Sequence, residues 1–126
     1  MEKSVIIKQE VINSLLSYAQ IYHPKEGILL LRGKTSKTEI NITSTVIPPL
    51  ATHSYSFSSF PFYMLPIDSS IVGVAHSHPS GTKHPSTEDL NNFYGRLMVI
   101  ITYPYKTEED ITIFDRAGKP VKFNVT

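Results

Sequence analysis

The chain of 126 residues is predicted to fold as a single-domain α/β protein, a mixed β-sheet flanked by helices. Two observations predict this fold class. Short apolar runs with strand character outnumber segments with helical periodicity, and the helical segments fall between the strands. The length, with 40% apolar and 18% charged residues, is that of one globular domain with its own core. We therefore treat residues 1–126 as one domain.

The N-terminal part alternates strand and helix patterns. Residues 5–7 form a short apolar run that is typical of a strand. Apolar residues at helical spacing predict a helix over about 9–22, which His23-Pro24 ends because proline disfavours helical backbone in the residue before it. The next expected elements are a strand over 27–32, a turn through 33–36 and a strand over about 39–47.

The segment from Leu50 to Ser70 carries two competing patterns. Tyr55 and Phe57 alternate as in an edge strand, whereas residues 60–65 favour a short helix before Pro66. We interpret its aromatic side chains as a packed flap, and a groove wall stays open as the alternative.

The C-terminal part contains the most apolar strand patterns. Residues 71–75 form a buried strand that runs into a histidine-rich segment. Ser86 followed by acidic residues predicts the start of a helix through Tyr94, which Gly95 closes. The last expected elements are a buried strand over 97–102 and a hairpin of 111–114 with 121–125 around residues 116–119.

Composition excludes several function classes. A net charge of +1 with scattered basic residues does not form the basic cluster of a nucleic-acid-binding surface. The absence of cysteine excludes disulfides and thiolate zinc sites. No apolar run approaches the span of a bilayer, and residues 1–3 lead directly into a strand pattern without a signal-peptide core. We expect a cytoplasmic protein that binds neither nucleic acid nor membranes, and its oligomeric state stays open.

Two imidazoles and a carboxylate follow the buried strand at close intervals. Alternate side chains of a strand share a face, so His76 and His78 point the same way with Cα atoms roughly 7 Å apart. Asp89 returns to them from the far side of a loop. Two nitrogens and one carboxylate oxygen leave one position of a tetrahedral zinc ion open to water, which distinguishes a catalytic zinc site from a structural one. Zinc lowers the pKa of such a water to about 7.

A site of this kind needs a proton acceptor that is not itself a ligand. The candidate is Glu26, which opens the apolar strand 27–32. Each assignment has a plainer alternative: Glu26 as an ordinary strand-end acid, Ser86 as a helix N-cap only, and Glu88 as the ligand in place of Asp89. The remaining histidines have no partner at ligand spacing and are interpreted as surface or loop residues, namely His23, His53 and His84.

The pattern His-x-His-Pro, six residues, Ser-x-x-Asp resembles the JAMM motif of the MPN-domain metalloproteases. It is filled without insertion or deletion by His76, His78, Pro79, Ser86 and Asp89. The likeness covers nearly the whole chain, because three further segments are similar to the compact archaeal members: Glu26-Gly27-Ile28-Leu29-Leu30, Met64-Leu65-Pro66-Ile67 and Ile101-Thr102-Tyr103-Pro104-Tyr105.

The resemblance implies an MPN/JAMM fold with the architecture of the cytidine deaminases. It also implies that His76, His78 and Asp89 bind Zn²⁺, that Glu26 is the general acid/base, and that Ser86 supports the oxyanion. The implied reaction is hydrolysis of an amide bond by zinc-activated water, with no covalent intermediate.

Relatives with this motif commonly release ubiquitin or ubiquitin-like modifiers from lysine side chains. We therefore expect a zinc-dependent isopeptidase that cuts after the C-terminal Gly-Gly of ubiquitin-like small modifier proteins, with those modifiers and their conjugates as partners. Trimming of a peptide extension from a sulfur-carrier protein is a related interpretation with the same chemistry.

Three interpretations of other classes are weaker. A non-catalytic MPN scaffold is disfavoured because every motif position is filled. Pro79-Ser80-Gly81 and Pro85-Ser86 also resemble RadC-like proteins, but the low positive charge and the lack of a helical DNA-binding extension argue against DNA repair. Zinc nucleoside deaminases need a Pro-Cys-x-x-Cys segment, which a chain without cysteine cannot supply.

Overall fold

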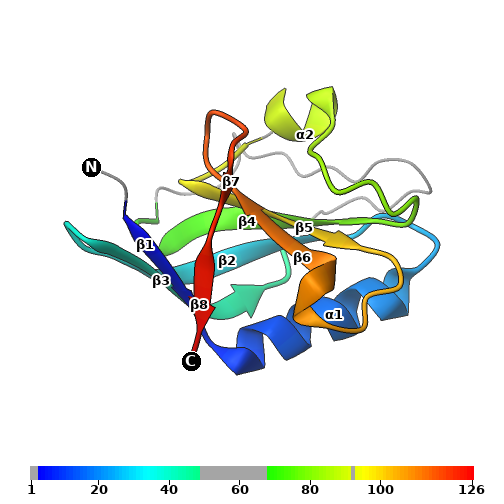
Figure 1. The fold of residues 1–126 in the computed structure, drawn as a ribbon, viewed down its shortest axis with the longest axis horizontal. Helices are drawn as coiled ribbons and strands as arrows, with labels where there is room; N and C mark the ends of the chain where they lie inside the picture. Colours follow the sequence, from blue (N-terminus) through cyan, green and yellow to red (C-terminus); the bar gives the residue numbers. More distant parts are fainter. Residues whose placement is uncertain (1–2, 49–67, 92) are drawn as a thin grey trace.

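The described residues, 3–48, 68–91 and 93–126 of a computed structural model, form one mixed sheet with two α-helices (Figure 1). The strand expected at Tyr55 and Phe57, the helix expected over 60–65, and His53 lie outside these residues. The strand order is β7-β6-β5-β4-β2-β3-β1-β8. The elements are β1 (Ser4–Ile7), α1 (Gln9–Tyr22), β2 (Ile28–Thr35), β3 (Glu39–Val46), β4 (Ile71–His78), α2 (Thr87–Asn91), β5 (Leu97–Thr102), the 3-10 helix η2 (Glu108–Asp110), β6 (Ile111–Phe114), β7 (Pro120–Val121) and β8 (Phe123–Val125).

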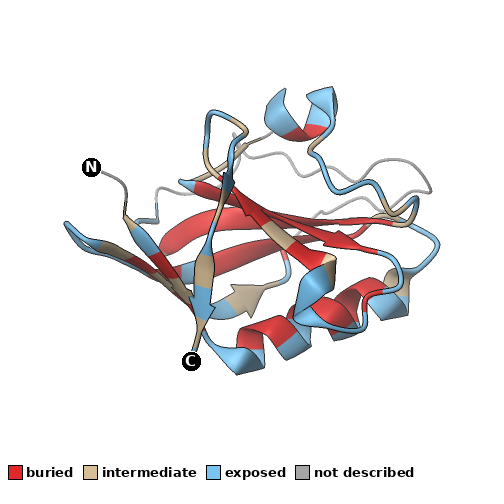
Figure 2. Ribbon diagram, in the orientation of Figure 1, coloured by how far each residue is buried: buried red, intermediate tan, exposed pale blue. Residues whose placement is uncertain are grey.

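Strands β2, β4 and β5 form the centre of the sheet. β4 pairs antiparallel with β2 and parallel with β5. All eight residues of β4 and all six of β5 are buried, which is the burial pattern of strands covered on both faces (Figure 2). A continuous apolar run in the sequence therefore becomes a central strand.

Helix α1 covers one face of the sheet, and α2 lies on the opposite side (Figure 1). Ile12, Leu15 and Ala19 repeat at helical spacing and belong to the larger core cluster, together with Leu29 and Leu31 of β2. A smaller cluster contains Ile28, Val74, Met98, Ile100 and Phe114. No helix among the described residues is long and apolar enough to cross a membrane.

The C-terminal hairpin is the main departure from the sequence prediction. The segment 121–125 is two strands: β7 pairs with β6, and β8 pairs parallel with β1 at the other end of the sheet. Only Lys122 separates β7 from β8, although these strands lie at opposite ends of the strand order. The sheet is therefore strongly curved, which brings its two edges together (Figure 1). Local alternation could not distinguish one strand from two, because the change of partner depends on the curvature of the whole sheet.

The turn expected over residues 33–36 is also corrected. β2 continues to Thr35, with a register shift between Arg32 and Gly33. A Cβ atom at Gly33 would lie 1.7 Å from the carbonyl oxygen of Asn41 on β3. This glycine therefore marks a bulge with close backbone approach instead of a turn.

The second helix is shorter than predicted. α2 ends at Asn91, whereas the apolar pattern extended the helix through Tyr94 to a closing Gly95. Gly95 has φ +79°, and a Cβ there would lie 2.6 Å from the carbonyl carbon of Val72. Gly95 therefore allows the backbone to approach β4 closely just before β5 begins. This requirement comes from tertiary packing and is not visible in the helical periodicity of the sequence.

Candidate metal centre

Strand β4 presents both histidines on one face of the sheet, as the strand alternation predicted. His76 pairs in register with Ile28 of β2 and Ile100 of β5, which place it beside the smaller core cluster. His78 is the last residue of β4. The two residues are 1% and 6% exposed, so both imidazoles are held inside the protein.

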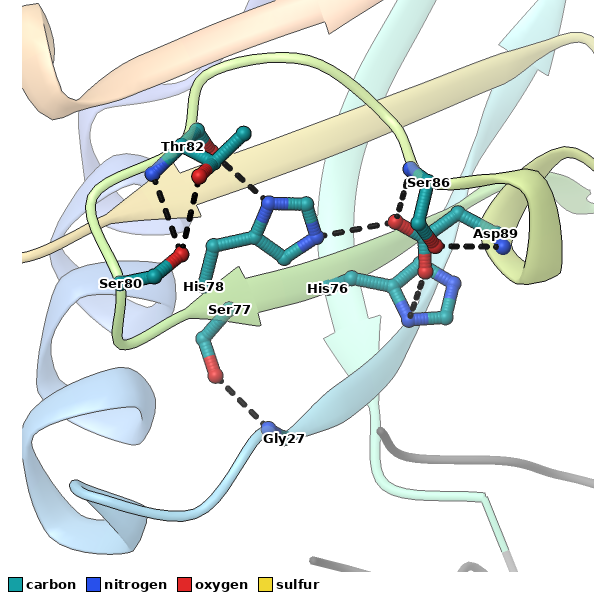
Figure 3. A network of polar contacts seen from close by, with 8 residues as sticks. All are labelled: Gly27, His76, Ser77, His78, Ser80, Thr82, Ser86 and Asp89. Atoms are coloured by element: carbon teal, nitrogen blue, oxygen red, sulfur yellow. Dashed lines mark hydrogen bonds and ion pairs between the residues drawn. The ribbon is translucent and has the colours of Figure 1, made fainter. Parts of the chain in front are cut away.

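Asp89 reaches the histidines from the first turn of α2 (Figure 3). The Ser86 hydroxyl accepts a hydrogen bond from the Asp89 backbone N–H at 3.0 Å, and Asp89 Oδ2 accepts one from the Ser86 backbone N–H at 2.8 Å. This reciprocal pair is a capping box with aspartate at its third helical position. It confirms Ser86 as the N-cap, and it also orients the Asp89 carboxylate.

His78 is fixed by both ring nitrogens. Nδ1 lies 2.8 Å from the carbonyl oxygen of Thr82, and Nε2 lies 2.9 Å from Asp89 Oδ2. Because a carbonyl oxygen only accepts, Nδ1 carries a proton and Nε2 faces the carboxylate. Burial lowers the pKa of His78, but the hydrogen bonds to Asp89 and Thr82 outweigh burial and raise it above its ordinary value. Metal-bound histidines are commonly oriented by a second-nitrogen contact of this kind.

His76 is the more deeply buried of the two histidines. Among the described residues neither of its ring nitrogens has a hydrogen-bond partner, and Nδ1 lies 3.6 Å from Asp89 Oδ1. Burial lowers its pKa to about 4, so the ring is neutral at neutral pH. An unpartnered buried polar group costs about 1–3 kcal/mol. A neutral imidazole with a free nitrogen beside a carboxylate fits a metal ligand, because a coordinate bond would satisfy it.

Glu26 lies at the mouth of the cluster, two residues before β2. Its carboxylate, an Asp89 oxygen and a His78 nitrogen all lie within 4.8 Å of one another. Burial raises the pKa of Glu26 to about 7, and the nearby acids Asp89 and Glu88 contribute in the same direction. A carboxyl group with this pKa exchanges a proton near neutral pH.

The five expected site residues therefore lie together, with Asp89 as the shared neighbour of the other four. Glu26 and His78 gather with Asp89, whereas His76 approaches the group through Asp89 alone. Glu26, His78 and Ser86 also line a pocket of about 260 Å³. The division of these side chains into three ligands and one proton acceptor stays a prediction.

Two groups that support the site were not predicted from the sequence. The carbonyl of Thr82 orients His78, and no side-chain pattern reports a backbone acceptor. Ser77 lies between the two histidines and contacts Gly27, and its only signal was its position within the motif. His84 lines the pocket, whereas His23 stacks on Tyr103 outside the described metal group.

Residues 8–116 match the family described as prokaryotic homologues of the JAB domain. The chain belongs to this family. A Haloferax volcanii protein described as a probable metalloprotease is 31% identical to this JAB homologue over 121 residues, covering 90% of this chain and 74% of that protein. The JAMM/MPN resemblance found in the sequence is thereby confirmed.

Two solved structures are similar to this JAB homologue over nearly their full lengths. A JAB1/MPN domain protein from Archaeoglobus fulgidus is 25% identical with a TM-score of 0.72, covering 99% of both chains. A protein described as JAMM, a metalloprotease-like zinc site in the proteasome and signalosome, is 27% identical with a TM-score of 0.69, covering 98% of this chain and 99% of that one. The predicted fold class is confirmed, and the chain has a metalloprotease-like fold with a cluster that could hold a metal.

Proposed function

We propose that the protein is a zinc-dependent isopeptidase that hydrolyses the bond after the C-terminal Gly-Gly of a ubiquitin-like small modifier. The observation that carries the proposal is the convergence of Glu26, His78 and Asp89 beside the ring of His76, whose nitrogens have no hydrogen-bond partner in the described part of the chain. Membership of the JAB family supports the hydrolytic chemistry. The choice of modifier rests on the JAMM resemblance.

The donor set suits zinc. His76, His78 and Asp89 would hold the ion through two nitrogens and one oxygen, the set found in catalytic sites with an open position. Bound zinc would lower the pKa of a water molecule and polarise the substrate carbonyl. His78 Nε2 lies 2.9 Å from Asp89 Oδ2, so both groups could reach one cation.

The protein's own groups supply proton transfer and oxyanion binding. Glu26, with a pKa of about 7, takes a proton from water at a carboxylate oxygen and returns it to the leaving amine nitrogen. The Ser86 oxygen accepts from the Asp89 N–H, so its own proton remains available to the substrate carbonyl oxygen. The pocket that both residues line has a volume of only about 260 Å³, which would suit a substrate whose cleaved end carries no side chain, as glycine does.

Metal analysis tests the ligand set. We expect about one zinc per chain in the parent protein and loss of zinc from His76→Ala and His78→Ala, because each removes one of few donors. Glu88→Gln is the matched control: Glu88 is an exposed acid next to Asp89 and outside the described metal group, so zinc should be retained. Stoichiometric zinc in a His76→Ala/His78→Ala double variant would disprove the assigned site.

Cleavage of Gly-Gly-linked modifier conjugates tests the reaction. The zinc-loaded protein should release the modifier, and a chelator should stop it. Glu26→Gln should keep zinc and the fold but lose on the order of a hundredfold in rate, because an amide cannot accept the proton. Activity of Glu26→Gln within a factor of two of the parent would contradict the assigned base. Cleavage of a linear Gly-Gly extension without cleavage of a lysine-linked conjugate would contradict the isopeptidase proposal.

A further inference from the structure

Ser77 lies between the two site histidines in sequence but points to the other side of β4. Figure 3 shows its side chain directed away from the imidazoles and toward Gly27. The Ser77 hydroxyl accepts a hydrogen bond from the Gly27 N–H at 2.7 Å, and the Ser77 N–H donates to the Gly27 carbonyl at 3.1 Å. Ser77 is 1% exposed, so water does not compete for these bonds. One residue of β4 thus binds both backbone groups of one residue before β2.

Gly27 is held from the helix side as well. A Cβ atom at Gly27 would lie 2.6 Å from Cε2 of Tyr18, and the Tyr18 hydroxyl donates to the Ile28 carbonyl at 3.0 Å. Tyr18 belongs to α1 and is 8% exposed. The space that a side chain at residue 27 would need is therefore taken by the Tyr18 ring, with the Ser77 hydroxyl 3.4 Å from the same position, so only glycine fits there.

This arrangement bears directly on Glu26, the neighbour of Gly27. The regular ladder of β2 and β4 begins at Ile28 opposite His76, and Glu26, two residues before it, forms an isolated β-bridge. Ser77 extends the attachment by one residue through its side chain. Without that hydroxyl the buried Gly27 N–H would lose its acceptor, and Gly27 would keep only the bond from the Ser77 N–H to its carbonyl among its described contacts with Ser77.

We propose that Ser77 is a positioning residue, which places the Glu26 carboxylate against the histidine cluster by holding Gly27. It acts through the backbone and touches no reacting atom. The inference rests on the proposed function, in which Glu26 carries the proton. It adds a residue on the opposite face of β4 on which the rate depends.

Amide hydrogen exchange at Gly27 tests the contact without reference to activity or metal. In Ser77→Ala the Gly27 amide should exchange about tenfold or more faster than in the parent, because its acceptor is gone. Ser77→Thr keeps an oxygen at this position and should restore protection. Thr102→Val is the matched control, since Thr102 is a buried residue of β5 paired with His78 and its hydroxyl donates to Asp110 at 3.2 Å, away from Gly27.

A double-mutant cycle tests the route of the effect. Ser77→Ala should keep its zinc and lower kcat about tenfold or more with little change in KM, because a misplaced proton acceptor slows the chemical step. In a Glu26→Gln background the same substitution should cost no more than about twofold, since the group it positions is already inactive. Thr102→Val should leave kcat near the parent value in both backgrounds.

Two results would overturn the inference. One is Gly27 exchange in Ser77→Ala that equals the parent's. The other is a rate loss of the same size with and without Glu26, which would mean that Ser77 acts on something else. A zinc-loaded parent that cuts no Gly-Gly conjugate would contradict the proposed function alone, and the exchange result would then decide whether Ser77 holds Gly27.

Discussion

Asp89 is the residue on which the polar contacts of the site converge. Its Oδ2 accepts from Ser86 and contacts His78, while its Oδ1 lies 3.6 Å from His76. Burial raises the pKa of Asp89, but the hydrogen bond to His78 and the neighbouring groups bring it down to about 2. The carboxylate is therefore ionised at neutral pH, and a buried negative charge of this kind is best compensated by a cation.

The neutral His76 makes the stability of the metal-free protein depend on pH. Its folded pKa of about 4 lies below the ordinary value of about 6.5. The unfolded chain therefore binds a proton that the folded chain does not, so this contribution is complete above pH 6.5 and is lost as pH falls toward 4. Between pH 7 and 4 the free energy of unfolding should therefore fall by roughly 3 kcal/mol less in His76→Gln than in the parent. Denaturant unfolding of chelator-treated protein measures this difference.

Other groups of the site titrate in the same pH range, but their contributions to the unfolding free energy are largely the same in the parent and in His76→Gln. The raised pKa of Glu26 has the opposite sign: its contribution is present below about pH 4.5 and is lost as pH rises through 7. Because parent and His76→Gln share Glu26, the difference between their unfolding free energies isolates His76. Parallel pH profiles for the two proteins would show that His76 does not titrate as the buried ring requires.

At the scale of elements, α2 is short and is set in place by its cap. It spans Thr87–Asn91, with Ser86 as the N-cap. Ser86→Ala should cost about 1 kcal/mol of stability through the lost acceptor. Separately, it should cost about ten- to a thousandfold in rate through the lost donor to the oxyanion.

Ser86→Gly separates these two effects, because glycine is a tolerable N-cap and keeps the N–H that binds Asp89. This variant should unfold within a few tenths of a kcal/mol of the parent yet stay slow. Recovery of the rate together with the stability would reduce Ser86 to a cap.

The β2–β3 pair depends on a second local feature, the bulge at Gly33. Gly33→Ala should cost about 2–4 kcal/mol, because the added methyl would meet the Asn41 backbone, which cannot rotate away. Gly118→Ala is the control: its Cβ would make an ordinary contact 3.8 Å from Leu90, and only φ of +80° opposes it, at a cost of about 1–2 kcal/mol. Equal losses in thermal or denaturant unfolding would argue against the bulge.

At the scale of the whole molecule, the two ends of the sheet are joined through Lys122. β8 pairs with β1, and the partly buried Phe123 and Val125 pack against the larger core cluster. Removal of residues 122–126 should lower the free energy of unfolding by about 2–4 kcal/mol through lost apolar burial. Lys122→Ala should change it by less than about 0.5 kcal/mol, since this side chain is exposed. Truncation without loss of stability would mean that closure of the sheet contributes little.

The local patterns of apolar residues predict the best-defined elements of this fold. Helix α1 could be predicted because its apolar period is set by the face that packs on the core, and strand β5 because a continuous apolar run is buried on both faces. The histidine pair could be placed on one face because strand alternation is a local property. His78 and Asp89 could be paired only through the motif interval, since the loop between them has no periodicity.

The sequence alone predicted the elements with strong apolar patterns, the fold class and the five candidate residues that the structure brings together, Glu26, His76, His78, Ser86 and Asp89. Only the tertiary structure decided that 121–125 divides between two ends of the sheet, that α2 stops at Asn91, and that Ser77 holds Gly27 from the opposite face. The physical reason is common to these cases. Each depends on a backbone partner distant along the chain, and a partner's hydrogen bonds leave no trace in the local pattern of apolar and polar residues.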